Sequence, residues 1–518
     1  MGELLGYKRF VTNTALIAVT TIILVLISYA TVLVLSRNLG PFFYGVYSQI
    51  KVAVSLLAQL ATLSLGLAFI RFFAGEKDGV KIKKNFFSII FIVLAISLIF
   101  AFIFFLASPF LARYATKEPT TSIFFKLAAV LIILRAINVI EISFFEAFRK
   151  VKEYAIFKLV VSLAELFFTV LALYAGYSLL GVLIALIVAD FLLDLIIFIV
   201  INKYTKTSEH LTHNYITGYL KDSTPLLHFS TPLMIGVILA WLVQFSDQYI
   251  IGFFLGASAV GIYSISYSLS FLVKTAIEPL QVVLNPTLSA LWSQNCSSQR
   301  GTAQRSEQST ARESQLDEVS NYLFYAYKYT AILVIPIAFF LSFFSDIFIN
   351  LIATKEFSST ILPILALAQV FYSFYLIIGQ QVLLLLNKTK LIRNLLLVGA
   401  VINIIVNIIL VPLIGIIGAA ISTLATFVFI TIASIYIAHK HIKLVFMPAL
   451  MTKIIFLSLA VSLFIRFLKP ASSMEAFIYL FVGSLVYLSF LLILNIIKRE
   501  ELVIFSDLIK KKIRGREP

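Results

Sequence analysis

The 518-residue chain contains little cysteine, little histidine and little charge. A single cysteine, Cys296, excludes an intramolecular disulfide framework, and five scattered histidines without an H-E-x-x-H motif or a Cys/His cluster provide no metal site. No G-x4-G-K-[ST] motif is present, which excludes ATP hydrolysis through a P-loop. Charged residues make up 13% of the chain, where soluble domains carry about 25%. We therefore expect a protein that is not an enzyme and has no cofactor and no metal.

Apolar residues dominate the sequence. They account for 61% of the chain, the mean hydropathy is +1.02, and 48 phenylalanines stand against two tryptophans. The first apolar stretch, 11–36, is longer than the ~7–15 residues of a signal-peptide core, so we expect a retained helix there. This composition predicts an all-α, polytopic membrane protein.

About fourteen segments are long and apolar enough to cross a bilayer, since a span needs about 20 residues. An even number returns both termini to the same side of the membrane. The expected spans are 11–36, 44–70, 85–107, 122–147, 154–176, 179–201, 226–254, 260–291, 321–351, 360–386, 391–411, 414–439, 447–468 and 475–497.

Positive charge is divided unevenly between the two sides. The termini and the loops on their side hold 28 Lys and Arg residues, whereas the other loops hold six. Because cytoplasmic loops are enriched in Lys and Arg, we expect both termini to be cytoplasmic in a multi-pass protein of the cell membrane. The net charge of +16 is then a consequence of topology, and we expect no nucleic-acid partner.

The loops on the outer side are little more than turns, so they leave no room for an enzyme domain. The longest polar segment is the cytoplasmic insertion 293–320, which is rich in Ser, Gln, Arg and Glu. Such a composition favours a disordered linker.

The sequence contains an internal repeat. Segments 39–48 and 255–264 share the pattern L-G-x4-G-[VI]-Y-S, position by position. Two weaker echoes follow in the same order, and they pair 149–152 with 387–390 and 179–181 with 416–418. We expect two six-helix lobes, 1–220 and 221–445, followed by helices 13 and 14 with a basic cytoplasmic tail in 446–518. Six spans is an even number, so the copies are parallel repeats, an arrangement that supports alternating access.

Several motifs carry a resemblance to a known family. Residues 36–40 with 44–47, 66–72, 247–256 and 412–423 resemble, in this order, the signatures of the Wzx-like polysaccharide-biosynthesis (O-antigen) flippases. That family belongs to the multidrug/oligosaccharidyl-lipid/polysaccharide exporter superfamily. The resemblance implies a central cavity lined by helices 1, 2, 7 and 8. It also implies movement of a polyprenyl-(pyro)phosphate-linked oligosaccharide, or polysaccharide repeat unit, from the cytoplasmic to the outer leaflet.

Charged and polar residues within or beside these four spans are the candidate substrate contacts, because a charge at membrane depth is costly without a partner or a wet cavity. Lys51, Arg71 and Lys274 could attract a pyrophosphate or acidic sugars. Asp247 and Glu278 could bind sugars or a coupling ion, either a proton or sodium. The alignment of 39–48 with 255–264, extended at the same offset, gives a counterpart for four of the charged candidates, at positions 51, 247, 274 and 278. None of these counterparts is charged. The candidates are Arg37, Lys51, Arg71, Gln244, Asp247, Lys274, Glu278 and Gln281.

Simpler interpretations stay open for most of these residues. Lys274 and Glu278 could form an ion pair on one helix face, and Asp247 could anchor the outer loop. Arg37 and Arg71 could snorkel from helix ends. Six further charges in spans 4 to 6 are expected to form buried pairs between helices: Arg135, Glu141, Lys158, Glu165, Asp190 and Asp194. Pro232 and Pro279 interrupt apolar helices and are candidate hinges or static bends.

Three other functions compete with flipping. A proton- or sodium-coupled multidrug exporter of the MATE type should carry a carboxylate in the first span, and 11–36 has none. A polyprenyl-sugar glycosyltransferase would need larger outer loops, and a non-transporting scaffold is disfavoured only by the cavity charges. For the leading interpretation we expect a monomer whose partners are the lipid-linked glycan, membrane lipids and glycan-assembly enzymes.

Overall fold

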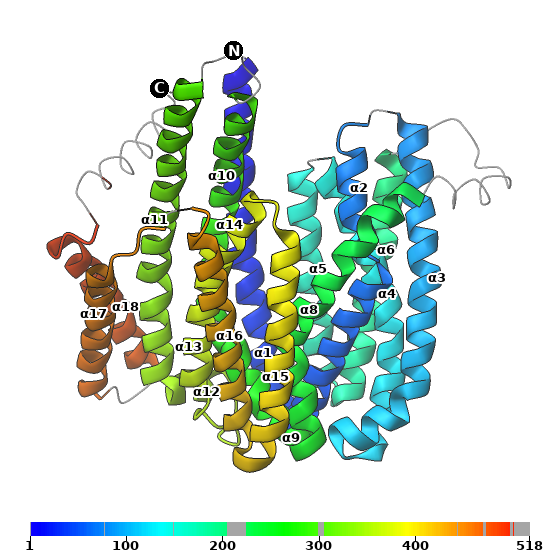
Figure 1. Cartoon of the computed structure of the whole chain (residues 1–518). Helices are drawn as coiled ribbons and strands as arrows, with labels where there is room; N and C mark the ends of the chain where they lie inside the picture. The colour runs from blue at the N-terminus through cyan, green and yellow to red at the C-terminus, as the bar shows by residue number, and fades with distance from the viewer. Residues whose placement is uncertain are drawn as a thin grey trace. The chain divides into compact units, whose positions relative to one another are not determined.

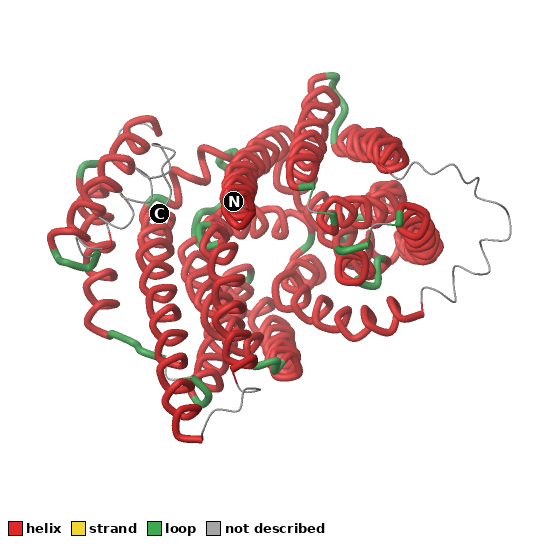
Figure 2. Tube along the Cα trace, turned by 90° about the horizontal axis from the view of Figure 1, so that it is seen from above, coloured by secondary structure: helices red, strands yellow, loops and turns green. Residues whose placement is uncertain are grey.

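The computed structural model is all-helical in the part of the chain that it describes, which is 2–76, 78–148, 150–204, 224–298, 305–442, 444–469, 473–497 and residue 501 (Figure 1). The predicted all-α class is confirmed. Figure 2 shows these residues as helices joined by short loops. The helices are α1 (Gly2–Ala61), α2 (Leu65–Phe73), α3 (Gly79–Leu111), α4 (Ser122–Ala147), α5 (Val151–Tyr174), α6 (Leu179–Tyr204), α8 (Thr224–Leu255), α9 (Ala257–Thr275), α10 (Glu278–Ser298), α11 (Arg305–Phe343), α12 (Ser345–Ile352), α13 (Leu362–Phe374), α14 (Gln380–Leu385), α15 (Thr389–Ile414), α16 (Ile416–His439), α17 (Pro448–Phe467) and α18 (Ser473–Ile493).

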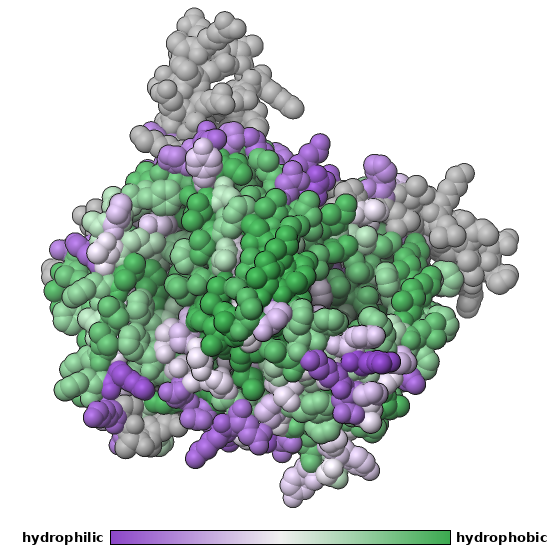
Figure 3. All heavy atoms as spheres, turned by 60° about the horizontal axis from the view of Figure 1, so that its bottom comes forward, coloured by the Kyte–Doolittle hydropathy of each residue, from purple (hydrophilic) through white to green (hydrophobic). Residues whose placement is uncertain are grey.

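Thirteen helical stretches of the described residues are long and apolar enough to cross a membrane. The first, Val19–Ala61, is 43 residues long and contains most of the predicted first span, 11–36, and most of the second, 44–70. These two join at Gly40, whose φ of 68° and ψ of 174° leave the helical region, a conformation that glycine adopts without a Cβ clash. The predicted count of about fourteen therefore agrees with the structure. Apolar side chains dominate the face drawn in Figure 3.

Two predicted spans are divided in the structure. The single eighth span, 260–291, is two helices, because α9 ends at Thr275 and α10 begins at Glu278. Pro279 is the second residue of α10 and has no N–H to donate to the carbonyl of Thr275, so the helix of α9 cannot continue through it without a break. The expected ninth span divides at Phe344 into α11 and α12. The tenth, 360–386, is confirmed as one stretch, Leu362–Leu385, which contains a π turn at Tyr375–Gly379 between α13 and α14.

The insertion 293–320 is not the disordered linker that its composition suggested. Helix α10 continues to Ser298 and α11 begins at Arg305, while 299–304 lie outside the described residues. Gln, Glu, Arg, Ala and Leu are strong helix formers, and no proline occurs between Pro286 and Pro336. The basic tail after Glu501 also lies outside the described residues.

Clustering of the chain by contact separates two compact units. Unit 1 comprises 1–266, 352–361 and 389–426, and unit 2 comprises 267–351, 362–388 and 427–518. Each unit has its own apolar core. In unit 1, Phe69, Phe86 and Phe144 pack together from α2, α3 and α4. In unit 2, the core is built on α11, and the hydroxyl of Tyr487 in α18 donates to the carbonyl of Ile332 in α11 at 3.1 Å.

The two copies of the repeat motif contact each other reciprocally within unit 1. A Cβ on Gly45 would lie 1.9 Å from the carbonyl oxygen of Ala257, and a Cβ on Gly261 would lie 2.0 Å from that of Pro41. Ala257 and Pro41 are themselves partners in the alignment of the two motifs, and so are Ser48 and Ser264, whose hydroxyls lie 2.8 Å apart. A contact in which each copy presents the same surface is the signature of a two-fold relation. The internal repeat is therefore present in the fold as well as in the sequence.

We predict that Gly45→Ala and Gly261→Ala each destabilise the protein. The added methyl would overlap backbone oxygen, which cannot move aside as a flexible side chain could, and overpacking of this kind costs about 1–3 kcal/mol. Gly236→Ala in α8 is the matched control, because its Cβ would meet no atom within 4 Å and alanine favours a helix. Thermal unfolding in detergent measures the effect. Midpoints unchanged in both motif variants would contradict the tight contact.

Candidate functional site

Asp247 lies at the centre of a buried polar cluster in unit 1. Its side chain belongs to α8, is 2% exposed, and accepts hydrogen bonds from the hydroxyls of Tyr263 in α9 and Thr423 in α16, the latter at 3.2 Å. The backbone N–H of Gln248 donates to its other oxygen at 2.8 Å. Hydrogen bonds to the ionised form offset the cost of burying a carboxylate. Direct contact between Asp247 and a substrate would therefore require α9 or α16 to move.

A second set of buried amides and hydroxyls adjoins this carboxylate. The side-chain oxygen of Asn403 in α15 accepts from Ser246 at 2.9 Å and from Asn407 at 3.0 Å, and its backbone oxygen accepts from Ser422 at 2.9 Å. Among the described residues, the Asn403 amide nitrogen and the Asn407 amide oxygen have no hydrogen-bond partner. This cluster links α8, α15 and α16. We name it, together with Asp247, Tyr263 and Thr423, the Asp247 cluster.

The other polar cluster of unit 1 consists of charges on α4, α5 and α6. Arg135 donates to Glu165 at 2.6 Å and to Asp190 at 3.1 Å, so the predicted ion pairs between helices are confirmed for these three residues. Asn138 donates to Asp194 at 3.2 Å. We name Arg135, Asn138, Glu141, Glu165, Asp190 and Asp194 the charge network.

The prediction of a buried ion pair is wrong for two other residues. Glu141 faces another carboxyl group, that of Asp194, and no cation pairs with it in the described structure. Lys158 in α5 is within electrostatic range of Glu146 in α4, but its direct hydrogen bond is on its own helix, where its ammonium group donates to the hydroxyl of Tyr154 at 2.5 Å. Sequence spacing gave no means of telling which charges on neighbouring spans would meet.

Lys51, in the second half of α1, has an exposed side chain although it lies within an apolar span. It is close enough to Arg135 and Glu165 to interact with both electrostatically, and so is Tyr47, one turn earlier. A charge inside a span usually faces a wet cavity or a partner. Glu165 is the neighbour of opposite charge within range of Lys51.

The remaining candidates in unit 1 lie apart from the charge network. Arg37 is exposed on α1 shortly before the Gly40 kink, and Arg71 is exposed in the last turn of α2. Gln244 is half-buried on α8 and donates to the carbonyl of Ala240 at 3.2 Å. Pro232 lies within α8.

Three candidates and a hinge proline lie in unit 2, around the break between α9 and α10. Lys274 is in the last turn of α9, Glu278 begins α10, and the two charges attract each other across the break. The ammonium group of Lys274 also lies 4.3 Å from the centroid of the Phe271 ring. Gln281 is half-buried one turn further along α10. The predicted i,i+4 arrangement on one continuous helix is wrong, because Pro279 ends that continuity.

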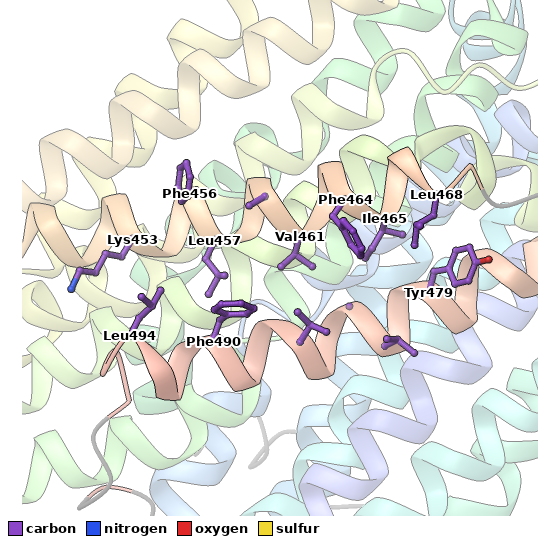
Figure 4. Close-up of a pocket in the computed structure, with 14 residues that line it drawn as sticks. Lys453, Phe456, Leu457, Val461, Phe464, Ile465, Leu468, Tyr479, Phe490 and Leu494 are labelled. Carbon is purple, nitrogen blue, oxygen red and sulfur yellow. The ribbon is translucent and has the colours of Figure 1, made fainter.

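An apolar groove runs between α17 and α18 in unit 2 (Figure 4). Its volume is about 640 Å³, and its lining is apolar apart from Lys453 toward one end and Tyr479 toward the other. Phe456 and Phe464 on its edge are 71% and 62% exposed, so the groove is open along its side. The sequence contained no signal for it, because a groove depends on how two apolar helices meet.

The family of the chain follows from its sequence profile. Residues 10–292, more than half of the chain, match the family described as "Polysaccharide biosynthesis protein". The chain belongs to this family, in agreement with the resemblance found from its motifs.

Two relatives and two solved structures give the family its context. The probable low-salt glycan biosynthesis flippase Agl15 of Haloferax volcanii is 26% identical over 44% of this chain and 44% of its own length. The uncharacterized membrane protein MJ1068 of Methanocaldococcus jannaschii is 28% identical over 31% of this chain and 32% of its own length. The matched region thus spans less than half the length of these curated relatives.

The solved structures agree in fold alone. The lipid II flippase MurJ, in an inward closed conformation, superposes with a TM-score of 0.69 at 16% identity and covers 95% of this chain and 99% of its own. An inward-facing multidrug resistance MATE transporter of the MOP superfamily superposes with a TM-score of 0.60 at 14% identity. It covers 83% of this chain and 96% of its own.

We predict that Tyr263→Phe lowers the thermal stability of the protein. The change removes one donor to the buried carboxylate of Asp247 and should cost about 1–3 kcal/mol, because hydrogen bonds to charged groups are among the stronger ones. Tyr174→Phe is the control, since that side chain is 92% exposed. Equal unfolding midpoints for the two variants would show that the Asp247 cluster is not a stabilising element.

Proposed function

We propose that this protein moves a polyprenyl-(pyro)phosphate-linked oligosaccharide from the cytoplasmic to the outer leaflet by alternating access. Membership of the polysaccharide-biosynthesis family supports a transporter of this kind, and the groove between α17 and α18 carries the proposal. A lipid-linked glycan needs an apolar channel for its chain and cations for its phosphate. The chain supplies both kinds of surface.

The groove suits an isoprenoid chain better than a compact drug. It is long, apolar and open along its side, so a chain could enter from the bilayer without first leaving it. Lys453 toward one end could meet a phosphate while the chain stays in the groove. Helices α17 and α18 are also outside the two repeated lobes, so they add a feature that a bundle of two six-helix lobes lacks.

We propose that Lys51, Lys274 and Arg71 attract the phosphate or acidic sugars, and that Arg37 also contacts the substrate. Lys51 and both arginines are exposed, and Lys274 is half-buried beside the helix break at Pro279. We propose that Gln244, Gln281 and Glu278 bind sugar hydroxyls. Asp247 has its oxygens occupied by protein donors, so we propose that it holds α8, α9 and α16 in position.

The cellular setting belongs to the same proposal. The charge bias of the loops supports cytoplasmic termini in the cell membrane, and the two-fold relation of the repeat motifs supports rocking of two lobes, 1–220 and 221–445. Pro279 at the α9–α10 break is the better-supported hinge, since Pro232 lies within the continuous helix α8.

A cation-coupled multidrug exporter is the alternative, and the shared fold of the MATE transporter favours it. That structure covers 83% of this chain, whereas the MurJ structure covers 95%. The first span also lacks the carboxylate that we would expect of such an exporter. Cells lacking the gene distinguish the two functions, because a missing flippase leaves lipid-linked glycans in the inner leaflet and a missing exporter changes sensitivity to cationic drugs.

We predict that Lys51→Ala and Lys274→Ala each reduce glycan export at least about tenfold at normal protein levels. A hydrogen bond to a charged group contributes about 1.5–3 kcal/mol, and 1.4 kcal/mol corresponds to a factor of ten. Lys355→Ala is the control, because that lysine is an exposed cation in a loop outside the spans. Complementation of the deletion strain, scored by surface glycan, is the measurement. Full export by both variants would remove these cations from the transport path.

We predict that Ala460→Trp blocks flipping while the protein stays folded. The indole would fill part of the groove, because Ala460 lines it. Leu463→Trp is the control, because Leu463 lies on the same helix, is 48% exposed and does not line the groove. Flipping of extracted lipid-linked glycan in vesicles is compared for the two variants. Equal activity would mean that the groove holds only ordinary acyl chains.

A further inference from the structure

Two carboxyl groups face each other at the buried end of the charge network. Glu141 in α4 is 1% exposed and Asp194 in α6 is 8% exposed. The two side chains lie within hydrogen-bonding reach of each other. Among the described residues, however, Oε2 of Glu141 and Oδ2 of Asp194 have no partner when both groups are treated as ionised. An ionised carboxylate only accepts hydrogen bonds, so the two groups can hydrogen-bond to each other only if one of them carries a proton.

The charge balance of the surrounding network supports the same conclusion. Its charged members are four carboxyl groups and Arg135, with Lys51 within electrostatic range from α1. Full ionisation would leave an excess of two negative charges inside the membrane-spanning part of unit 1. Isolated buried charge is strongly disfavoured there, and two adjacent carboxylates rarely both ionise.

Other groups do not remove this excess. Arg135 is engaged by Glu165 and Asp190, and Asn138 presents its amide nitrogen to Asp194. Tyr47 interacts with Arg135, Glu165 and Asp190, beyond the facing pair. Helices α2 and α3 bring no charged neighbour to Glu141 or Asp194 in the described part of the chain.

We propose that Glu141 and Asp194 form a proton-binding site that exchanges its proton during transport. A proton lets the two facing carboxyl groups hydrogen-bond to each other. A hard metal cation would need a shell of about six oxygens, and Asn138 turns its nitrogen toward the pair, which leaves too few ligands. No group of three or more His, Cys, Asp or Glu residues suited to a metal occurs among the described residues.

The charge network also provides a route to this site. Lys51, which lies beside the network, has an exposed side chain. The exposed fraction of the side chain falls to 35% at Arg135 and 23% at Glu165, and then to 6% at Asp190. Asp194 lies one helical turn after Asp190, and Glu141 is the innermost member. A proton could therefore reach the pair through polar groups without crossing apolar core.

Packing of the lobe does not require these charges. In the alignment that pairs 149–152 with 387–390, Arg135 corresponds to Ser373 and Glu141 to Gly379. In the alignment that pairs 179–181 with 416–418, Asp190 and Asp194 correspond to Phe427 and Thr431. The second copy of the repeat therefore folds with none of them.

Loss of the proton would place two negative charges side by side between α4 and α6. Their repulsion would separate the two helices, so the protonated and deprotonated sites favour different arrangements of the first lobe. That this difference drives glycan movement rests on the proposed function. The proton site itself stands on the geometry of unit 1.

Infrared spectroscopy of the purified protein tests the site without any glycan. A protonated carboxyl group has a carbonyl stretching band that an ionised one lacks, and we expect such a band at neutral pH from a buried, shared proton. As the pH rises the pair loses its proton, so the band should disappear reversibly. Glu141→Gln and Asp194→Asn should each remove it.

Glu165→Gln is the matched control, because Glu165 pairs with Arg135 and is not one of the two facing carboxyl groups, so the band should remain. Absence of the band in the wild type at neutral pH, or its persistence in both Glu141→Gln and Asp194→Asn, would overturn the proposal. If a variant fails to fold, the pH titration of the wild-type band decides the question. Glycan movement without this band would contradict the proton site alone, while the band without glycan movement would contradict only the proposed function.

Discussion

The close approach of α1 and α9 at Gly45 and Gly261 determines where the polar chemistry of unit 1 lies. Without a Cβ at either position, the two copies of the repeat motif lie backbone against backbone. Two residues after each glycine comes a tyrosine, and the repeat makes Tyr47 and Tyr263 partners. Tyr47 interacts with the charge network, and Tyr263 donates to Asp247. One contact thus orients a tyrosine toward each polar cluster.

On this two-fold scaffold the polar clusters themselves differ. The charge network on α4, α5 and α6 has a surplus of carboxyl groups, whereas the Asp247 cluster holds one carboxylate surrounded by amides and hydroxyls. Symmetric parts of the fold serve packing, and the asymmetric charges are free to serve transport. In the transport that we propose, the buried proton would supply energy, the exposed Lys51 would attract the head group, and the apolar groove of α17 and α18 would hold the lipid chain.

Much of this fold could be predicted from sequence because the bilayer restricts the alternatives. Runs of about 20 apolar residues gave the helices, and the L-G-x4-G-[VI]-Y-S echo predicted a repeat whose partners, Ser48 and Ser264, are in contact. Two errors have a common cause. The length of the apolar run predicted one helix across the break before Pro279, and the polar composition of 305–320 predicted disorder where strong helix formers make a helix. Both errors arise because hydropathy does not report the backbone preferences of the residues.

The site was less predictable, since it depends on which faces of separate helices meet. Arg135 pairs with Glu165 as expected, whereas the role of Lys51 as a substrate contact stays a prediction. The facing of Glu141 and Asp194 depends on the rotation of α4 against α6, which a single sequence does not specify. Asn403 and Asn407 were detectable only as amides four residues apart in an apolar helix, a weak signal.

The most direct test of glycan transport by this protein is a flipping assay with the purified protein. Vesicles containing the protein and lipid-linked glycan extracted from the source cells would be treated with a glycan-modifying reagent that cannot cross the membrane. We expect glycans of the inner leaflet to become accessible to the reagent in vesicles with the protein and to stay protected in vesicles without it. Equal protection in both kinds of vesicle would contradict the proposal that the protein flips lipid-linked glycans.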